Sequence, residues 1–126
     1  MKCERNLALI VTIVPKGWGD TVMCASRDAG AEGGTVMFAR GCGIHEKKSI
    51  LGIAIEPEKE VVLTLVSREI EERMLETVSK AAELDKPGRG MAFLVPVERA
   101  IGRVHFIEML EEETEESHEE GTDRDS

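Results

Sequence analysis

Hydrophobic and polar positions in the first half of the chain switch between the spacing of strands and that of helices. Residues 6–14 are almost all apolar and end at Pro15, a pattern typical of a central β-strand buried on both faces or nearly so. Apolar residues then recur at three- and four-residue steps from Trp18 to Ala29, which predicts an amphipathic helix. Another extended run follows at residues 35–40. The first half therefore predicts a strand, a helix and a strand.

The second half repeats this order after a polar loop at residues 44–49 and a short apolar run at 51–55. Between residues 70 and 82 apolar side chains step by four, and glutamates cluster at the start of this segment, where the helix dipole favours anions. The predicted elements of this half are a strand at 60–66, a helix at 69–83, a strand at 91–97, a helical turn at 98–102 and a short strand at 103–106.

Two strand–helix–strand halves in tandem favour an α+β, ferredoxin-like (βαββαβ) sandwich, in which a four-stranded antiparallel sheet carries both helices on one face. Two helices cover only one face of such a sheet. The strands at 6–14 and 60–66 show little polar alternation, so we expect the uncovered face to be apolar as well. An apolar open face favours an oligomer that packs sheet against sheet.

The charge of the chain is concentrated at its C-terminal end. The net charge is −9, yet residues 1–107 hold 15 basic and 15 acidic side chains, whereas residues 108–126 hold ten acidic side chains and one arginine. A dense block of like charge repels itself and buries nothing, so we predict a domain at 1–110 followed by a disordered acidic tail at 111–126. The neutral body lacks the basic field that nucleic-acid binding requires.

Hydropathy and cysteine content indicate the cellular compartment. No apolar run approaches the roughly 18 residues of a membrane span, and the apolar stretch near the N-terminus has no small-residue cleavage site after it. Three cysteines without a CxxC spacing favour reduced thiols over a disulfide framework. We therefore expect a cytoplasmic protein without direct membrane insertion.

Two glycine-containing loops are the strongest candidates for a binding site. The first is Gly41-Cys42-Gly43, preceded by Arg40, and the second is Lys86-Pro87-Gly88-Arg89-Gly90. Glycines let backbone N–H groups converge on an anion, and basic side chains add charge, a combination that suits phosphate. Short glycine patterns are also common as plain turns. Phosphate binding is therefore a hypothesis that the loops alone do not decide.

Other chemistry has weaker support in the sequence. Cys42 and His45 have a CxxH spacing suited to a soft metal, but no second pair of ligands lies nearby in the sequence, so no metal site is predicted. No serine stands in a recognisable nucleophile motif, and we predict no catalytic residue. An acyl phosphatase on the same fold would need an Arg–Asn pair at a phosphate loop, whereas Asn6 is the only asparagine in the chain.

Four motifs, in their order and spacing, resemble the nitrogen-regulatory PII signal proteins over about residues 6–106. The resemblance implies a ferredoxin-like homotrimer that regulates rather than catalyses, with adenine nucleotides bound in clefts between neighbouring subunits. It also implies a mobile loop, here at about 41–56, that contacts a partner protein such as a membrane transporter or a metabolic enzyme. The motifs are Gly33-Gly34-Thr35-Val36, Gly41-Cys42-Gly43, Lys86-Pro87-Gly88-Arg89-Gly90-Met91-Ala92-Phe93 and Pro96-Val97-Glu98-Arg99-Ala100-Ile101.

The resemblance also assigns nucleotide-binding positions. The glycines at the base of the mobile loop fall where the family contacts the nucleotide, and the loop before residue 91 falls on the phosphate side. Met91, Gly102 and Val104 replace cations that the family usually carries. The candidates to take their place are Lys86, Arg89, Arg40, Arg99 and Arg103. The expected nucleotide-binding residues are Thr35, Gly41, Gly43, Thr64, Lys86, Gly88, Arg89, Gly90 and Arg103.

Two functions stay open at this point. The first is a regulator that binds an adenine nucleotide (ATP, ADP or AMP, with or without Mg²⁺) and controls a partner protein through its mobile loop. Because the expected site has lost cations, ADP or AMP is expected to bind at least as tightly as ATP. The alternative is a trimeric ferredoxin-like protein that binds a metal or a small anion at a degraded nucleotide site. Cys42, His45 and the missing cations support this second function, whereas the order of the motifs over about 100 residues supports the first, which is the leading hypothesis.

Overall fold

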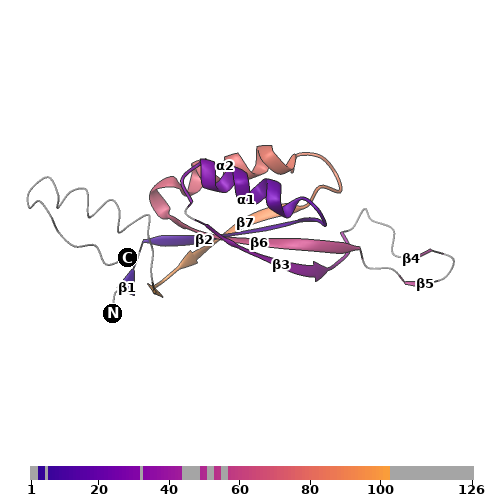
Figure 1. Ribbon diagram of the computed structural model, residues 1–126, viewed down its shortest axis with the longest axis horizontal. Coiled ribbons are helices and arrows are strands. Elements are labelled where there is room, and N and C mark those ends of the chain that lie inside the picture. The colour runs from indigo at the N-terminus through magenta and orange to yellow at the C-terminus, as the bar shows by residue number, and fades with distance from the viewer. Residues whose placement is uncertain are drawn as a thin grey trace, which may run out of the picture.

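One four-stranded antiparallel sheet, in the order β3-β6-β2-β7, carries both α-helices on the same face (Figure 1). The computed structural model describes residues 3–4, 6–31, 33–43, 49–50, 53–54 and 57–102. This arrangement confirms the predicted ferredoxin-like α+β sandwich. The elements are β1 (Cys3–Glu4), β2 (Leu7–Pro15), α1 (Gly19–Asp28), β3 (Thr35–Arg40), β4 (Ser49–Ile50), β5 (Ile53–Ala54), β6 (Glu58–Ser67), the 3₁₀ turn η1 (Arg68–Ile70), α2 (Glu71–Ala82), β7 (Met91–Val97) and β8 (Ala100–Ile101).

Strand β2 is central and pairs with β6 on one side and β7 on the other, so that Ile10 lies opposite both Thr64 and Leu94. Along most of β2, fully buried residues alternate with half-buried ones. The fully buried side chains pack under the helices, and the half-buried ones lie on the opposite, open face of the sheet. The apolar run of the sequence therefore has one fully buried face in the single chain rather than two.

The core between sheet and helices forms because each helix places its apolar stripe on the sheet. Helix α2 buries Met74, Val78 and Ala82 at four-residue spacing, and α1 buries Val22. The buried Ser26 hydroxyl of α1 donates to the Val22 carbonyl oxygen at 2.8 Å, which satisfies its hydrogen-bonding capacity inside the core. These contacts fix both helices over β2 and β6.

The segment after β7 differs from the prediction of a helical turn at 98–102. Ala100 and Ile101 form strand β8, which pairs antiparallel with Glu4 and Cys3 of β1. Ile101 is 64% exposed, so this segment has no apolar stripe to pack on the core as a helix would. Its backbone partner instead comes from the other end of the chain, a contact that local sequence patterns do not reveal.

Several expectations concern residues outside the described ranges. The predicted strand at 103–106, the acidic tail at 111–126 and Arg103 lie there, as does much of the segment 41–56. The described parts of that segment include the short pair β4 and β5, which the sequence did not predict. Among the described residues, no helix has the length and apolar character needed to cross a bilayer.

Candidate functional site

A pocket of about 450 Å³ lies at one end of the sheet, where the two glycine-containing loops meet. In an antiparallel sheet of this order, the last residues of β3 and β2 stand at the same end as the first residues of β6 and β7. The loop after β3 and the loop before β7 therefore lie at the same end of the sheet, on its two edge strands, although they are separated in sequence. The pocket is lined by Ile13, Ala39, Arg40, Gly41, Cys42, Gly43, Lys59, Val61, Gly88, Gly90 and Met91.

The loop before β7 needs glycine to reach this position. Gly90 has a φ of +119°, and a Cβ at this residue would overlap the carbonyl oxygen of Ile13 on β2. Only glycine tolerates both the left-handed backbone and this close approach. The loop after β3 is anchored differently, because the Gly41 N–H donates to the Pro57 carbonyl oxygen at 3.1 Å. The two loops are thus held against the sheet from opposite sides of the pocket.

Four of the expected nucleotide-binding residues line this pocket: Gly41, Gly43, Gly88 and Gly90. The two expected threonines do not line it. Thr35 is exposed on β3, and the side chain of Thr64 is completely buried on β6. The Thr64 Oγ1 has no hydrogen-bond partner among the described residues. Gly34, just before β3, runs close to β6 beside this residue, because a Cβ there would lie 2.8 Å from the Leu63 carbonyl oxygen.

The basic side chains of the second glycine loop, Lys86 and Arg89, interact with other side chains of the protein. Arg89 places its Cζ 3.9 Å from the ring centroid of Trp18, in a cation–π contact. Lys86 donates from Nζ to Glu83 Oε1 at 2.8 Å. That hydrogen bond and the attraction of the two charges lower the pKa of Glu83 and raise the pKa of Lys86. Neither Lys86 nor Arg89 lines the pocket.

The positive charge at the pocket comes from two residues on neighbouring strands, Arg40 and Lys59. Lys59 is only 8% exposed. It was missed as a candidate because the predicted strand began at residue 60, which left Lys59 outside the strand. Strand β6 begins at Glu58 instead, and Lys59 lies in the sheet opposite Ala39 and Pro15. Its position two residues before the apolar Val61, in the two-residue period of a strand, was the available signal.

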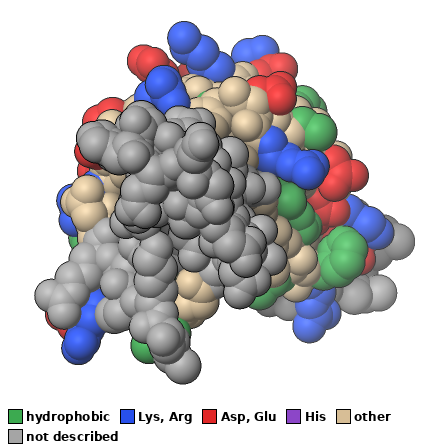
Figure 2. All heavy atoms as spheres, turned by 60° about the vertical axis from the view of Figure 1, so that its left-hand side comes forward, with side chains coloured by type: hydrophobic (Ala, Val, Ile, Leu, Met, Phe, Trp, Pro, Cys, Tyr) green, Lys and Arg blue, Asp and Glu red, His purple; other side chains and the backbone are tan. Residues whose placement is uncertain are grey.

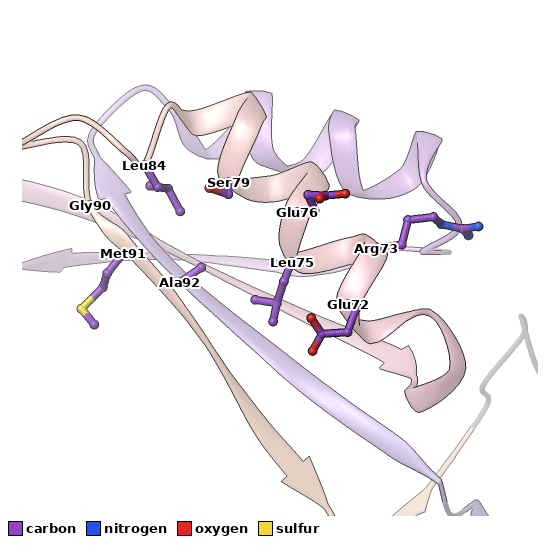
Figure 3. Close-up of a pocket in the computed structure, with 9 residues that line it drawn as sticks. All are labelled: Glu72, Arg73, Leu75, Glu76, Ser79, Leu84, Gly90, Met91 and Ala92. Atoms are coloured by element: carbon purple, nitrogen blue, oxygen red, sulfur yellow. The ribbon is translucent and has the colours of Figure 1, made fainter.

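A second pocket, of about 600 Å³, lies between helix α2 and the edge strand β7 (Figure 3). Figure 3 shows Glu72 and Leu75 directed from α2 toward the side of β7, while Arg73 points away along the helix. Gly90 and Met91 line both pockets, so the start of β7 separates them. Because its charged lining includes the carboxylates of Glu72 and Glu76, this second pocket is less suited to an anion than the first.

The two surfaces of the sandwich differ in polarity. Charged side chains of both signs stand over the upper part of the molecule in Figure 2, which is the helix side in Figure 1. On the open face of the sheet, large apolar side chains are exposed instead. Met37 of β3 and Met91, Phe93 and Val95 of β7 are 39–54% exposed and occupy the register positions of that face. The sequence expectation of an apolar open face is therefore confirmed for the single chain.

Comparisons with known proteins agree with this fold. Residues 7–103 match the family model described as nitrogen regulatory protein P-II. Among solved structures, the chain is similar to a PII protein from Arabidopsis thaliana described as bound to citrate, with a TM-score of 0.63 and 22% sequence identity over 79% of this chain and 84% of that one. A search of curated proteins finds no match. Since the family model covers most of the chain, the chain belongs to the nitrogen regulatory protein P-II family.

Proposed function

We propose that this chain is a cytoplasmic regulatory protein that binds an adenine nucleotide in the pocket between its two glycine loops. The observation that supports this most is the convergence of Gly41, Gly43, Gly88 and Gly90 on one pocket. These segments are far apart in the sequence, and the glycines of each let backbone N–H groups converge on a phosphate. The loop at 41–56 continues from this pocket and is the proposed contact with a partner, such as a membrane transporter or a metabolic enzyme.

We propose a homotrimer as the working form. The apolar open face supports association, because a monomer would leave Phe93 40% and Met91 54% exposed to water. The number of subunits comes from the P-II family resemblance. In such an assembly the nucleotide would lie in a cleft between subunits. Thr35 and Thr64, which do not line the pocket of the single chain, would contribute from their own or a neighbouring subunit.

Titration calorimetry on the full chain tests the nucleotide proposal. ATP, ADP and AMP are each titrated with and without Mg²⁺. At least one of them is expected to bind, and ADP or AMP should bind at least as tightly as ATP. The Gly41→Ala and Gly41→Val variants test whether the nucleotide binds in this pocket. The Gly41 backbone is not left-handed and a Cβ there meets nothing within 4 Å, so both variants should fold while they fill the pocket progressively. If none of the three nucleotides binds detectably at millimolar concentration, the proposal is overturned.

A small anion is the second candidate ligand. The similar Arabidopsis protein is described as bound to citrate, and the pocket described here holds two cations and no carboxylate among its lining residues. Citrate is therefore titrated in the same series. Among the described residues, no group of three or more His, Cys, Asp or Glu side chains could hold a metal ion. Binding of citrate without any nucleotide would favour the small-anion function.

A further inference from the structure

We propose that Arg89 is a positioning residue, whose contact with Trp18 holds the loop before β7 so that Gly88 and Gly90 present their backbone to the pocket. This inference rests on the proposed function, because it concerns the same pocket. At this loop the anionic group of the ligand would meet backbone N–H groups. The guanidinium group would act from behind the loop, without touching the ligand.

Two successive turns form the loop before β7. The Lys86 N–H donates to the Glu83 carbonyl oxygen at 3.1 Å, and the Arg89 N–H donates to the Lys86 carbonyl oxygen at 3.4 Å. These two bonds curl the loop, but they attach it neither to the sheet nor to α1. The place of the loop over the end of the sheet therefore depends on other contacts.

The indole ring of Trp18 gives the loop a fixed support. The Trp18 N–H donates to the Pro15 carbonyl oxygen at 3.1 Å, and the Trp18 carbonyl oxygen accepts from the Val22 N–H at 3.2 Å. The ring also packs against the buried cluster that contains Val14. Arg89 places its Cζ 3.9 Å from the centroid of this ring. Through Arg89 the loop is therefore attached to the core between the sheet and the helices.

Burial strengthens this attachment. Arg89 Nε and Nη2 are buried without a hydrogen-bond partner among the described residues. A cation–π contact stabilises more when the cation is desolvated, as it is here. Moving Arg89 away from the ring would lose this contact, so the loop is held most firmly in the position that keeps the two groups stacked.

The loop stands between the guanidinium group and the pocket. The sheet residues that line the pocket include Ile13 and, opposite it in register, Val61 and Met91 on the open face. Trp18 packs instead on the cluster beneath the helices. Gly88 and Gly90 line the pocket, whereas Arg89 between them does not. The guanidinium group therefore lies on the helix side of the loop, and the glycine backbone lies on the pocket side.

Amide hydrogen exchange and calorimetry on the full chain test this inference. In the free protein, exchange within residues 84–91 should be about 2- to 30-fold faster in Arg89→Met and in Trp18→Leu than in the wild type, the equilibrium ratio that corresponds to one cation–π contact. ADP should bind each variant more weakly by a factor in the same range. Because both substitutions break one contact, the double variant should bind ADP within about twofold of the weaker single variant.

Arg73→Met is the matched control. Arg73 Nη2 donates to the Ala29 carbonyl oxygen at 2.9 Å and so joins α2 to the end of α1. The substitution removes the same kind of side chain and the same charge, but Arg73 does not line the pocket between the glycine loops. It should leave the exchange of residues 84–91 unchanged and the affinity for ADP within about twofold of the wild type. Should Trp18→Leu unfold, as circular dichroism would reveal, Trp18→Phe keeps a smaller ring and should give an intermediate loss.

The two proposals fail in different ways. Unchanged exchange of residues 84–91 in either variant overturns the positioning role, whatever ADP does. Faster exchange with unchanged ADP affinity also overturns it, because the position of the loop would then not matter to the ligand. Affinity losses that multiply in the double variant overturn it as well, since Arg89 would then act on the ligand independently of Trp18. If the wild type does not bind ADP and exchange is faster in both variants, the nucleotide proposal fails and the positioning of the loop by Arg89 stands.

Discussion

The guanidinium group of Arg89 lies over the indole ring of Trp18, with 3.9 Å between Cζ and the ring centroid. This contact ties the loop before β7 to the turn before α1. Two guanidinium atoms, Nε and Nη2, are buried without a hydrogen-bond partner among the described residues, and the charge also helps to lower the pKa of the nearby Glu83. Such contacts stabilise a fold by about 0.5–2 kcal/mol, depending on how far the cation is desolvated.

Replacing Arg89 should therefore be visible in the fluorescence of Trp18, the only tryptophan of the chain. Arg89→Ala uncovers one face of the half-buried indole, so its emission should shift to the red and acrylamide should quench it more efficiently. The free energy of unfolding should fall by about 0.5–2 kcal/mol. Arg99→Ala is the control, because Arg99 is exposed and its removal should leave the emission unchanged. Equal quenching of wild type and Arg89→Ala would mean that the stacked arrangement is not populated.

The second prediction concerns the N-terminus of helix α1, which a carboxylate from the sheet caps. The Gly19 N–H donates to Glu60 Oε1 at 2.7 Å, which places a negative charge at the N-terminus of the helix. Glu60→Ala should lower the free energy of unfolding by about 1–2 kcal/mol, as the loss of a helix cap does. Gly19→Ala should also destabilise the fold, because its Cβ would displace the Glu60 carboxylate from its hydrogen bond with the N–H of residue 19.

A double-mutant cycle in urea identifies the cause of both effects. If each substitution acts by breaking the same hydrogen bond, the double variant should be less destabilised than the sum of the two single variants by at least about 0.5 kcal/mol. Strict additivity of the two losses would contradict the cap and would indicate that each residue acts on its own surroundings.

The spacing of apolar residues in the sequence predicts most elements of this fold. The features that it does not predict have physical causes. The helices and central strands were predicted because four-residue and two-residue apolar spacings report directly on burial against one core. The pairing of β8 with β1 was missed, since it joins the two ends of the described chain. Residues of both glycine loops line one pocket, whereas Lys59 was missed because the predicted strand began at residue 60, two residues after the observed start of β6. The stacking of Arg89 on Trp18 was missed because no local pattern links a loop to a ring 71 residues away.

The open face of the sheet gives a third prediction, on assembly. Phe93 of β7 lies opposite Val11 on the open face and is 40% exposed. A charge at this position cannot be buried without a partner, so Phe93→Glu should convert the proposed trimer to a monomer of 13.9 kDa. Phe38→Glu is the matched control, since Phe38 is 79% exposed at the edge of the sheet and lies opposite Glu60, on the helix side.

Light scattering during gel filtration measures both variants. The wild type and Phe38→Glu should elute at about three times the chain mass of 13.9 kDa, and Phe93→Glu at the chain mass itself. A wild type that stays monomeric at micromolar concentration would refute the trimer. Dissociation by Phe38→Glu but not by Phe93→Glu would place the subunit contact on the other side of the sheet.

The ion pair between Glu83 and Lys86 predicts a local pH dependence. The hydrogen bond from Lys86 holds the pKa of Glu83 below its ordinary value of 4.5. A lowered folded-state pKa favours the folded form above the unfolded-state value, and this contribution disappears as the pH falls through the folded-state pKa. Because both side chains are exposed, the effect on global stability should be small, and NMR titration of the Glu83 carboxyl is the suitable measurement. Lys86→Met should raise this pKa toward 4.5, and 1 M salt should do the same in the wild type. A Glu83 pKa unaffected by Lys86→Met would show that the pair does not form in solution.

The thiol of Cys42 offers a direct test of where the nucleotide binds. Cys42 is exposed and lines the pocket between the two glycine loops, whereas Cys24 is exposed on helix α1 and does not. A nucleotide in the pocket should shield Cys42 from a maleimide reagent, because the reagent must enter the same space as the ligand. Cys24 is the internal control, and its alkylation rate should stay constant.

Mass spectrometry of the digested protein follows both thiols in one sample. With ADP at ten times its dissociation constant, about nine-tenths of the sites are occupied, so the alkylation of Cys42 should slow about tenfold if only the empty pocket reacts. The slowing should be lost in Gly41→Val in proportion to its lost affinity. Protection of both thiols would indicate a general tightening of the protein instead of an occupied pocket. Protection of neither, under conditions where calorimetry shows ADP bound, would place the nucleotide away from the glycine loops.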